Sequence, residues 1–246
     1  MAIPTPVSWW NFNESSGNAA DAVASNTLTN FNTATYVAGK INNAVNFVRT
    51  SSQYLNITNA AQTGLGITGN MSISLWINLA SNVPANTNFA LVCKYDYTSS
   101  QQSYALDLIN NGVAGALKAR FIVSSTGSNN TQGIVSFLSG NLSLSTWYHL
   151  VAIYDAAAGS VEFYLNGVSQ GTATGMFTSI FNSTAPFQVS AFVNASGEYI
   201  DGKVDLLGIW NTKLGASDVS SLYNGGAGIA YPFRRSVGPF PMHFND

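Results

Sequence analysis

Apolar and polar residues alternate along most of the chain. In the stretch MSISLWINL, residues 71–79, every second residue from Met71 to Leu79 is apolar, and this period of two is that of a half-buried β-strand. Similar stretches recur at residues 7–12, 44–48, 53–57, 89–95, 104–109, 117–123, 133–138, 147–155, 160–167, 187–193 and 202–210. About a dozen short strands exceed the number in an immunoglobulin domain, so the pattern predicts an all-β antiparallel β-sandwich of the jelly-roll type.

Two turn signals connect predicted strands within residues 145–171. Asn166-Gly167 is a residue pair that favours a two-residue type I′ hairpin turn. Asp155 and Gly159 bracket the turn before it. The segment therefore reads as successive strands of one sheet.

One short helix is predicted near the end of the chain, in residues 213–226. Ser217 is a suitable N-cap, Asp218 favours the first turn through the helix dipole, and Gly225 can end the helix. Its apolar face would consist of Val219, Leu222 and Tyr223.

The chain divides into three predicted parts. Residues 1–6 are an N-terminal lead-in and residues 7–226 form the sandwich. Residues 227–246 have no periodicity and contain three of the seven prolines, so we expect an extended arm. Such an arm would pack on this chain or dock on a neighbour, in a homo-oligomer or in a virion assembly.

Composition excludes several classes of protein. Charged residues make up 8% of the 246 residues and the formal net charge is −2, which gives no basic surface for nucleic acid. Cys93 is the sole cysteine, so neither an intrachain disulfide nor a cysteine-based zinc site can form, and we expect a buried thiol. The sequence contains no apolar run of about 20 residues that would span a membrane, and its N-terminus has no pattern of a secretion signal.

Seven short motifs follow one another in a fixed order. They are WWNFNESSG (9–17), AGKINNAVNF (38–47), SISLWINL (72–79), WYHLVAIYD (147–155), VEFYLNGV (161–168), GKVDLLGIWNTKL (202–214) and SDVSSLYNGG (217–226). In this order they resemble the laminin-G-like jelly-roll domains of the concanavalin A-like lectin/glucanase superfamily. The resemblance implies the fold. Members of the family bind glycans or proteins, mediate adhesion or build virion and cell surfaces, so the fold alone does not assign a function.

The resemblance also implies a structural calcium ion, which many relatives hold between the first loop and a late strand. Asp21 and Asp205 match the family's two aspartates, and Asn26 can supply an amide oxygen to an ion that takes six to eight oxygens. The glycine-rich loop of the family is replaced here by Ala-Val-Ala-Ser-Asn at 22–26. In the alternative without calcium, Asp21 caps a turn and Asp205 pairs with a backbone amide or a cation.

Catalysis is not indicated by the acidic residues or by the histidines. The superfamily includes glycanases, which need two carboxyl groups close together. The nearest approach to such a pair is Asp201 and Asp205, in a strand that Gly202 interrupts. The chain has no G-x-S-x-G turn, and His149 lies inside a predicted strand, where we expect a packed or hydrogen-bonded structural residue. We therefore predict a protein that is not an enzyme.

Sugar binding needs exposed aromatic rings beside amides and carboxylates. Two segments offer such groups, and their candidate ligand-binding residues are Tyr95, Asp96, Tyr97, Gln101, Glu198 and Tyr199. In the alternative, these aromatic side chains cover the ends of the sandwich.

These observations favour a non-catalytic recognition or adhesion module that binds a glycan or a surface protein. The low charge, the absence of a secretion signal and the aromatic, proline-containing tail suit a phage virion decoration or tail component, located on a virion exterior or an extracellular surface. Two alternatives are a glycan-cleaving enzyme of the same fold and a purely structural assembly subunit.

Overall fold

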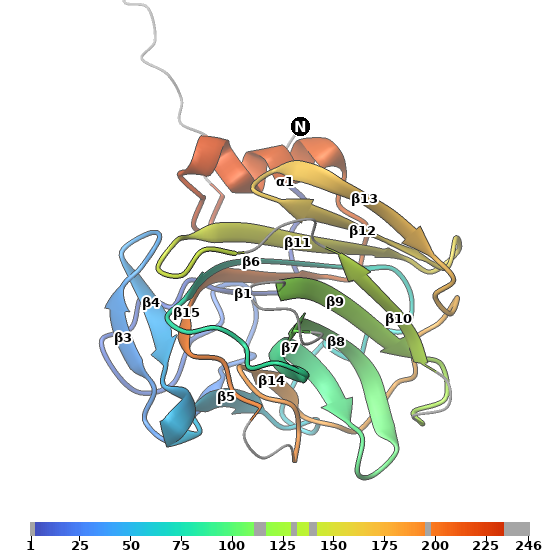
Figure 1. Ribbon diagram of the computed structural model, residues 1–246, viewed down its shortest axis with the longest axis horizontal. Coiled ribbons are helices and arrows are strands. Elements are labelled where there is room, and N and C mark those ends of the chain that lie inside the picture. Colours follow the sequence, from blue (N-terminus) through green and yellow to red (C-terminus); the bar gives the residue numbers. More distant parts are fainter. Residues whose placement is uncertain (1–2, 111–116, 129–131, 138–141, 195–197, 234–246) are drawn as a thin grey trace, which may run out of the picture.

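Two antiparallel sheets pack face to face, and a helix lies on the outside of one of them (Figure 1). A computed structural model describes residues 3–110, 117–128, 132–137, 142–194 and 198–233 of the protein. Within these ranges the sheets contain eight and seven strands, which confirms the predicted all-β sandwich.

Strand order defines the two sheets. The eight-stranded sheet runs β13 (Val168–Thr174), β12 (Ser160–Leu165), β11 (Tyr148–Asp155), β6 (Met71–Leu79), β15 (Gly202–Trp210), β4 (Asn43–Phe47) and β3 (Thr35–Ala38), and β1 (Ser8–Trp10) also pairs with β15. The seven-stranded sheet runs β10 (Gln132–Phe137), β9 (Leu117–Ser124), β8 (Gln101–Asn110), β7 (Thr87–Asp96), β14 (Phe187–Val189), β5 (Tyr54–Ile57) and β2 (Thr29–Phe31). Short 3₁₀ turns lie at Arg49–Ser51 and Asn224–Gly226.

The main core lies between the sheets and follows from the alternation along the strands. Leu75 of β6, Leu150 of β11 and Leu106 of β8 are buried in one cluster. Trp10 of β1 stacks on Phe187 of β14, with ring centroids 5.4 Å apart. Each large apolar side chain buried here contributes on the order of 1.5–3 kcal/mol, so the alternating pattern largely determines which faces meet.

β6 departs from the half-buried strand that its sequence predicts, because all nine of its residues are buried. Its outer face is covered by helix α1 (Ala216–Tyr223) and by residues next to it. Trp76, on that face, is 2% exposed and stacks on Tyr223 with ring centroids 5.8 Å apart. The helix thus creates a second core on the outside of the eight-stranded sheet (Figure 1).

The N-cap of α1 is Gly215 and not Ser217, so that prediction was wrong. The carboxylate of Asp218 accepts a hydrogen bond from the Gly215 backbone N–H at 2.9 Å, and this bond fixes the N-cap two residues earlier than predicted. Asn224 in the left-handed conformation ends the helix. Val219 and Leu222 are buried as predicted.

The predicted hairpin turn is confirmed between β12 and β13. Leu165 pairs with Val168, and the two residues between them have positive φ angles, 51° at Asn166 and 76° at Gly167. Both central residues of a type I′ turn need positive φ, which explains the residue pair found here.

Three strands lack the alternating pattern from which the other strands were predicted: β2, β3 and β13. The first two have three and four residues, and β13 (VSQGTAT) is mostly exposed at the edge of its sheet. Edge strands bury little side-chain surface, so they lack the alternation that reveals a half-buried strand.

The buried side chains of Cys93 and Lys94 both have hydrogen-bond partners. Cys93 is 0% exposed, which confirms the buried thiol, and its Sγ donates to the Ala191 carbonyl oxygen at 3.1 Å. Lys94 is also 0% exposed. Its ammonium group donates to three oxygens, namely Asn59 Oδ1 at 2.8 Å, Ser183 O at 2.7 Å and Ala185 O at 2.5 Å.

The beginning of the predicted C-terminal arm packs on the N-terminal strand. Asn11 exchanges two hydrogen bonds with the Tyr231 backbone, at 2.9 and 3.1 Å, and the rings of Phe233 and Trp9 meet edge to face at 4.9 Å. Residues 234–246 lie outside the described part of the chain, so the domain boundaries and the role of the arm stay predictions. No helix among the described residues is long and apolar enough to span a membrane.

Candidate functional site

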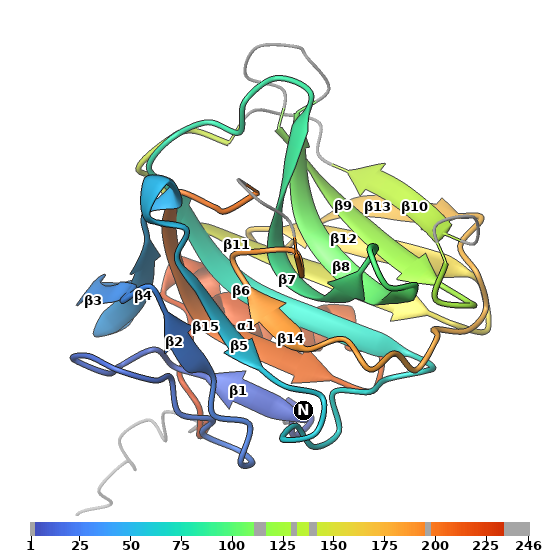
Figure 2. The same cartoon turned by 90° about the horizontal axis from the view of Figure 1, so that it is seen from below.

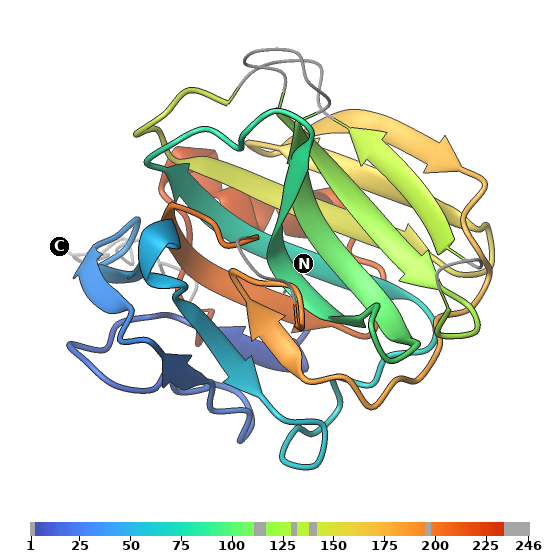
Figure 3. The ribbon, with the colours of Figure 1, turned by 60° about the horizontal axis from the view of Figure 1, so that its bottom comes forward.

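The outer face of the seven-stranded sheet is built from the side chains that alternate with the core residues. Phe187 and Val189 of β14 belong to the core, so Gln188 between them faces outward. The register places Gln188 between Asn56 of β5 and Cys93 of β7. Figures 2 and 3 look onto this face, with α1 on the far side of the molecule.

The connection from β14 to β15 folds back over this face. Its Ser190 N–H donates to the Leu91 carbonyl at 3.2 Å, and its Ile200 N–H donates to the Ser190 carbonyl at 3.3 Å. Phe192 of this connection packs against Tyr95, with ring centroids 5.8 Å apart. The loop therefore forms a wall on the outer side of strands β14 and β5.

A pocket of about 400 Å³ lies between this loop and the sheet. It is lined by Tyr54, Asn56, Pro186, Gln188, Ala191, Phe192, Val193, Asn194 and Tyr199. Its lining combines aromatic rings with three side-chain amides and contains no carboxylate. This combination is typical of sites for uncharged polar ligands.

Two of the lining amides have oxygens without a donor. Asn56 Oδ1 and Gln188 Oε1 are buried, and no described residue hydrogen-bonds to either atom. Gln188 is 6% exposed, so water has little access to its side chain. A buried acceptor left unpaired costs about 1–3 kcal/mol, and a ligand that brings hydroxyl donors into the pocket would recover this energy.

Aromatic rings form one wall of the pocket. The rings of Tyr54 and Tyr199 have centroids 6.2 Å apart, and Phe31 of β2 stacks on Tyr54 with ring centroids 4.7 Å apart. Arg49 Nε donates to the Tyr199 carbonyl at 3.1 Å, which holds that residue in place. Burial raises the pKa of the Tyr54 hydroxyl, with a further contribution from Tyr199, so Tyr54 is a neutral donor at ordinary pH.

Asn194, on the opposite wall, is positioned by Asp96. Its Nδ2 donates to Asp96 Oδ2 at 3.0 Å. The same carboxylate accepts from the Thr98 N–H at 2.9 Å, the Thr98 hydroxyl at 2.7 Å and the Ser99 hydroxyl at 2.7 Å. Burial opposes ionisation, but these hydrogen bonds outweigh it and lower the pKa of Asp96. Asp96 therefore acts as a charged support behind the pocket.

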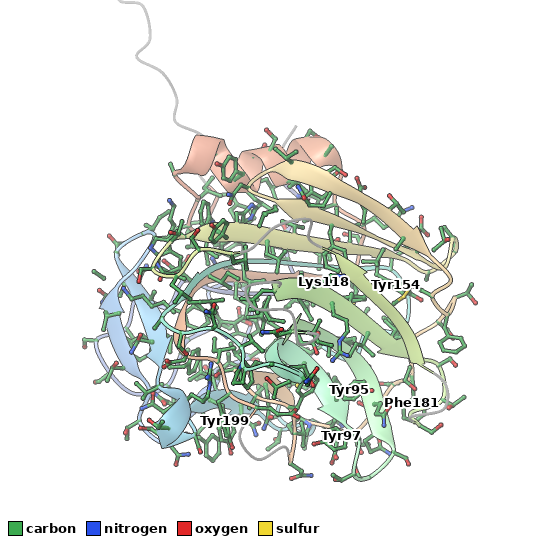
Figure 4. All side chains as sticks on the ribbon, viewed as in Figure 1. Tyr95, Tyr97, Lys118, Tyr154, Phe181 and Tyr199 are labelled. Atoms are coloured by element: carbon green, nitrogen blue, oxygen red, sulfur yellow. The ribbon has the colours of Figure 1, made fainter. Side chains whose placement is uncertain are left out.

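The six residues predicted to bind ligand divide between the pocket and its surroundings. Tyr199 lines the pocket, and Tyr97 is exposed at the end of β7 (Figure 4). Tyr95 is 4% exposed and packs inside the sheet face. Gln101 Oε1 accepts hydrogen bonds from Thr184 N at 2.7 Å and Thr184 Oγ1 at 3.0 Å, which fixes a loop. Ligand binding by these residues stays a prediction.

Glu198, the sixth, is close to a buried ion pair on β8 and β9. Arg120 donates to both oxygens of the fully buried Asp107, including Nε to Oδ1 at 3.0 Å. Burial raises the pKa of Glu198, and the Asp107 charge raises it further, while Arg120 opposes the shift. Asp107 and Arg120 were not identified from the sequence, since their contact depends on the register of two strands.

All three predicted calcium ligands accept hydrogen bonds from backbone N–H groups. Asp21 Oδ1 accepts from the Trp9 and Val23 backbone N–H groups, both at 3.0 Å, so it fixes the first loop to β1. The Asn26 amide oxygen accepts from Thr63 N at 2.7 Å. These oxygens therefore face N–H donors, where a cation would need further oxygens.

Asp205, the third, accepts three backbone hydrogen bonds. Its carboxylate accepts from the backbone N–H groups of Lys40 at 2.7 Å, Ile41 at 3.1 Å and Leu206 at 2.8 Å. No described hydrogen bond joins it to Asp21 or Asn26, and the described residues contain no cluster of three histidine, cysteine or acidic side chains suited to a metal. The arrangement fits the alternative in which both aspartates cap backbone amides, while calcium binding itself stays a prediction.

The residues considered for catalysis are also separated. Asp205 is fully buried under residues 40 and 41, so it cannot reach a substrate together with Asp201. His149 is 1% exposed, and its Nε2 lies 2.8 Å from Ser74 Oγ, which confirms a packed and hydrogen-bonded residue. Burial lowers its pKa to about 3, so the ring is neutral.

Comparisons with known proteins agree with this fold. The family model for the concanavalin A-like lectin/glucanases superfamily matches residues 49–220. A search of curated protein sequences gives no match. Domain 4 of AbnA, a GH43 extracellular arabinanase from Geobacillus stearothermophilus solved in complex with arabinotriose, is 18% identical with a TM-score of 0.64, covering 92% of this chain and 100% of that domain.

Two toxin domains are similar over about half of their length. The binding domain of botulinum neurotoxin serotype G is 13% identical with a TM-score of 0.66, covering 89% of this chain and 50% of the other. The binding domain of Paraclostridial Mosquitocidal Protein 1 is 15% identical with a TM-score of 0.64, covering 87% of this chain and 52% of the other. At these identities the similarity concerns the fold.

Proposed function

Because the chain belongs to the concanavalin A-like lectin/glucanases superfamily, we propose that it is a non-catalytic carbohydrate-recognition module. The sugar occupies the pocket between β14, β5 and the loop that follows β14. The observation that supports this most directly is the pair of unpaired acceptors, Asn56 Oδ1 and Gln188 Oε1, beside the rings of Tyr54 and Tyr199.

Sugars match both features of this lining. A sugar ring presents hydroxyl groups at its rim, which donate to amide oxygens, and C–H groups on its faces, which pack on aromatic rings. The pocket has acceptors and tyrosine rings within one enclosure of about 400 Å³. The arabinotriose complex of the similarly folded AbnA domain agrees with a carbohydrate as ligand class.

Binding without cleavage is favoured by the position of the carboxylates. Glycoside hydrolysis requires two carboxyl groups beside the scissile bond. The pocket lining contains none, Asp107 is held by Arg120, and Asp205 lies under a loop of the other sheet. The binding domains among the similar structures agree with a recognition role.

The proposal includes a location at an outer surface, because glycans are displayed there. On a virion, the module would decorate the particle or its tail, and on a cell it would act in adhesion. Assembly through residues 227–246 is compatible with either place, since Phe233 already packs on Trp9 at the side opposite the pocket.

Titration calorimetry against neutral plant and microbial oligosaccharides tests the proposal. We expect binding by the wild type, loss of binding in Tyr199→Ala, and a loss of about tenfold or more in Gln188→Leu, which removes an acceptor at similar volume. Val168→Ala, an exposed change on β13 of the other sheet, is the control. Release of reducing ends by the wild type would contradict a non-catalytic role, and no binding to any oligosaccharide would refute the sugar assignment.

A further inference from the structure

We propose that the pocket binds the interior of a neutral oligosaccharide chain, with additional sugar units held by Phe31 at one end and Tyr97 at the other. This inference rests on the proposed sugar-binding function and deepens it. It names a ligand longer than a single sugar and assigns Phe31 a role in binding it.

The exposed aromatic side chains carry the argument. Among the described residues, two aromatic side chains are classed as exposed, Phe31 and Tyr97, each at 38%. Exposed large apolar side chains are expected to be scattered over a protein surface. Here, Phe31 lies on β2 and Tyr97 directly follows β7 of the same sheet, and both are connected to residues that line the pocket.

Phe31 extends the aromatic wall to the edge of the sheet. Its ring lies parallel to that of Tyr54 at 2°, and β2 is the last strand of the sheet, so no further strand covers Phe31. Tyr54 itself lines the pocket together with Tyr199, whose ring centroid is 6.2 Å away. A ligand that leaves the pocket in this direction meets Phe31 next.

Tyr97 marks the opposite end. It lies between Asp96 and Thr98, and both of these residues accept a hydrogen bond from Asn194 Nδ2, at 3.0 and 3.3 Å. Asn194 lines the pocket. Figure 4 shows Tyr199 toward the β5 side and Tyr97 toward the β7 end of the same face.

The distance between the two aromatics fits a chain better than a monosaccharide. From β2 to β7 the sheet order is β2, β5, β14, β7. Neighbouring strands lie about 4.8 Å apart, so this path measures about 14 Å, longer than one sugar ring. The lining amides are uncharged, which favours neutral sugars.

Calorimetry with a length series tests the inference. The probes are arabino-, xylo-, manno-, cello- and malto-oligosaccharides from the monosaccharide to the hexasaccharide, titrated into the full chain. We expect the affinity to rise with length beyond the disaccharide. Phe31→Ala and Tyr97→Ala should each lower the affinity for the longest ligand about three- to tenfold and thereby reduce the rise of affinity with ligand length.

Controls separate this inference from the function on which it rests. Tyr199→Ala should weaken binding of short and long ligands alike, and Val168→Ala should change neither. Equal affinity for all lengths, or wild-type affinity of both Phe31→Ala and Tyr97→Ala for the longest ligand, would overturn the extended site while leaving the sugar-binding pocket intact. If no ligand binds the wild type, the sugar-binding function fails, and the extended site fails with it.

Discussion

We predict that two buried groups give opposite contributions to the pH dependence of stability. His149 on β11 and Asp205 on β15 each pair with Trp76 of the strand between them. Burial lowers the pKa of His149 from 6.5 to about 3. Burial also raises the pKa of Asp205 from 3.8 to about 7, although the backbone N–H groups that it accepts from, and the nearby Lys40, act in the other direction.

The sign of each group's contribution to the pH dependence of stability follows from whether the folded or the unfolded state binds more protons. A histidine with a lowered pKa in the folded state contributes its full stability above its unfolded value of 6.5, and this contribution is lost as the pH falls toward 3. An aspartate with a raised pKa contributes fully below its unfolded value of 3.8, and this contribution is lost as the pH rises toward 7. One pKa unit corresponds to about 1.4 kcal/mol, so between about pH 4 and pH 6.5 the two groups give slopes of about 1.4 kcal/mol per pH unit that nearly cancel.

Replacing either group removes the cancellation. In Asp205→Asn, the histidine slope remains, so the free energy of unfolding should fall by about 3 kcal/mol more than in the wild type when the pH is lowered by two units. In His149→Gln, the aspartate slope remains, and the difference should have the opposite sign. Both variants lose stability at every pH, because Asn offers fewer acceptors to three N–H groups and Gln fits the ring's site poorly.

Urea denaturation at several pH values between these limits measures the slopes. Glu162→Gln, on the edge hairpin, controls for the loss of a carboxylate, and the double variant Asp205→Asn with His149→Gln should restore the wild-type slope. Curves for Asp205→Asn that run parallel to the wild type at all pH values would refute the reasoning, since the Asp205 carboxyl would then titrate alike in the folded and unfolded states.

Three further outcomes follow from other parts of the fold. Lys94→Met should lower the free energy of unfolding by about 2–4 kcal/mol in urea denaturation, because three oxygens lose their donor, whereas Lys203→Met on the surface of β15 should change it little. Gly167→Ala should cost about 1–2 kcal/mol by the same assay, since its φ is 76° and an added Cβ would lie 2.8 Å from a tyrosine ring carbon, whereas Gly69→Ala has open space and should be neutral. The melting temperature should not respond to a calcium chelator, because the predicted ligands face N–H donors. A drop in melting temperature on chelation would support the calcium prediction instead.

The strands that bury one face were predictable because burial imposes a period that the sequence displays. β6 and β15 have the predicted bounds, and the Asn166-Gly167 turn has the predicted conformation. β13 could not be found in this way, since an edge strand with Ser, Gln, Thr and Gly buries too little to impose a pattern. The burial of both faces of β6 could not be predicted from its own sequence either. It depends on α1, which is some 140 residues away in the chain and packs on Trp76 and its neighbours.

The pocket was harder to predict because its residues are adjacent only through strand register. Tyr54 and Asn56 alternate with core residues of β5, so their side chains face outward. An aromatic ring and an amide on one outward face were the signal in the sequence that could have indicated the pocket. Tyr54 and Asn56 line a pocket only because β14 places Gln188 beside Asn56 and the loop after β14 contributes Tyr199. Acidic and aromatic residues that are close in sequence lie in single loops, so this pattern includes Tyr199, which lines the pocket, together with Tyr95 and Gln101, whose side chains stabilise the fold. In a sandwich of this kind, a pocket on a sheet face is lined by outward residues of neighbouring strands, which lie far apart in the sequence and form no contiguous motif.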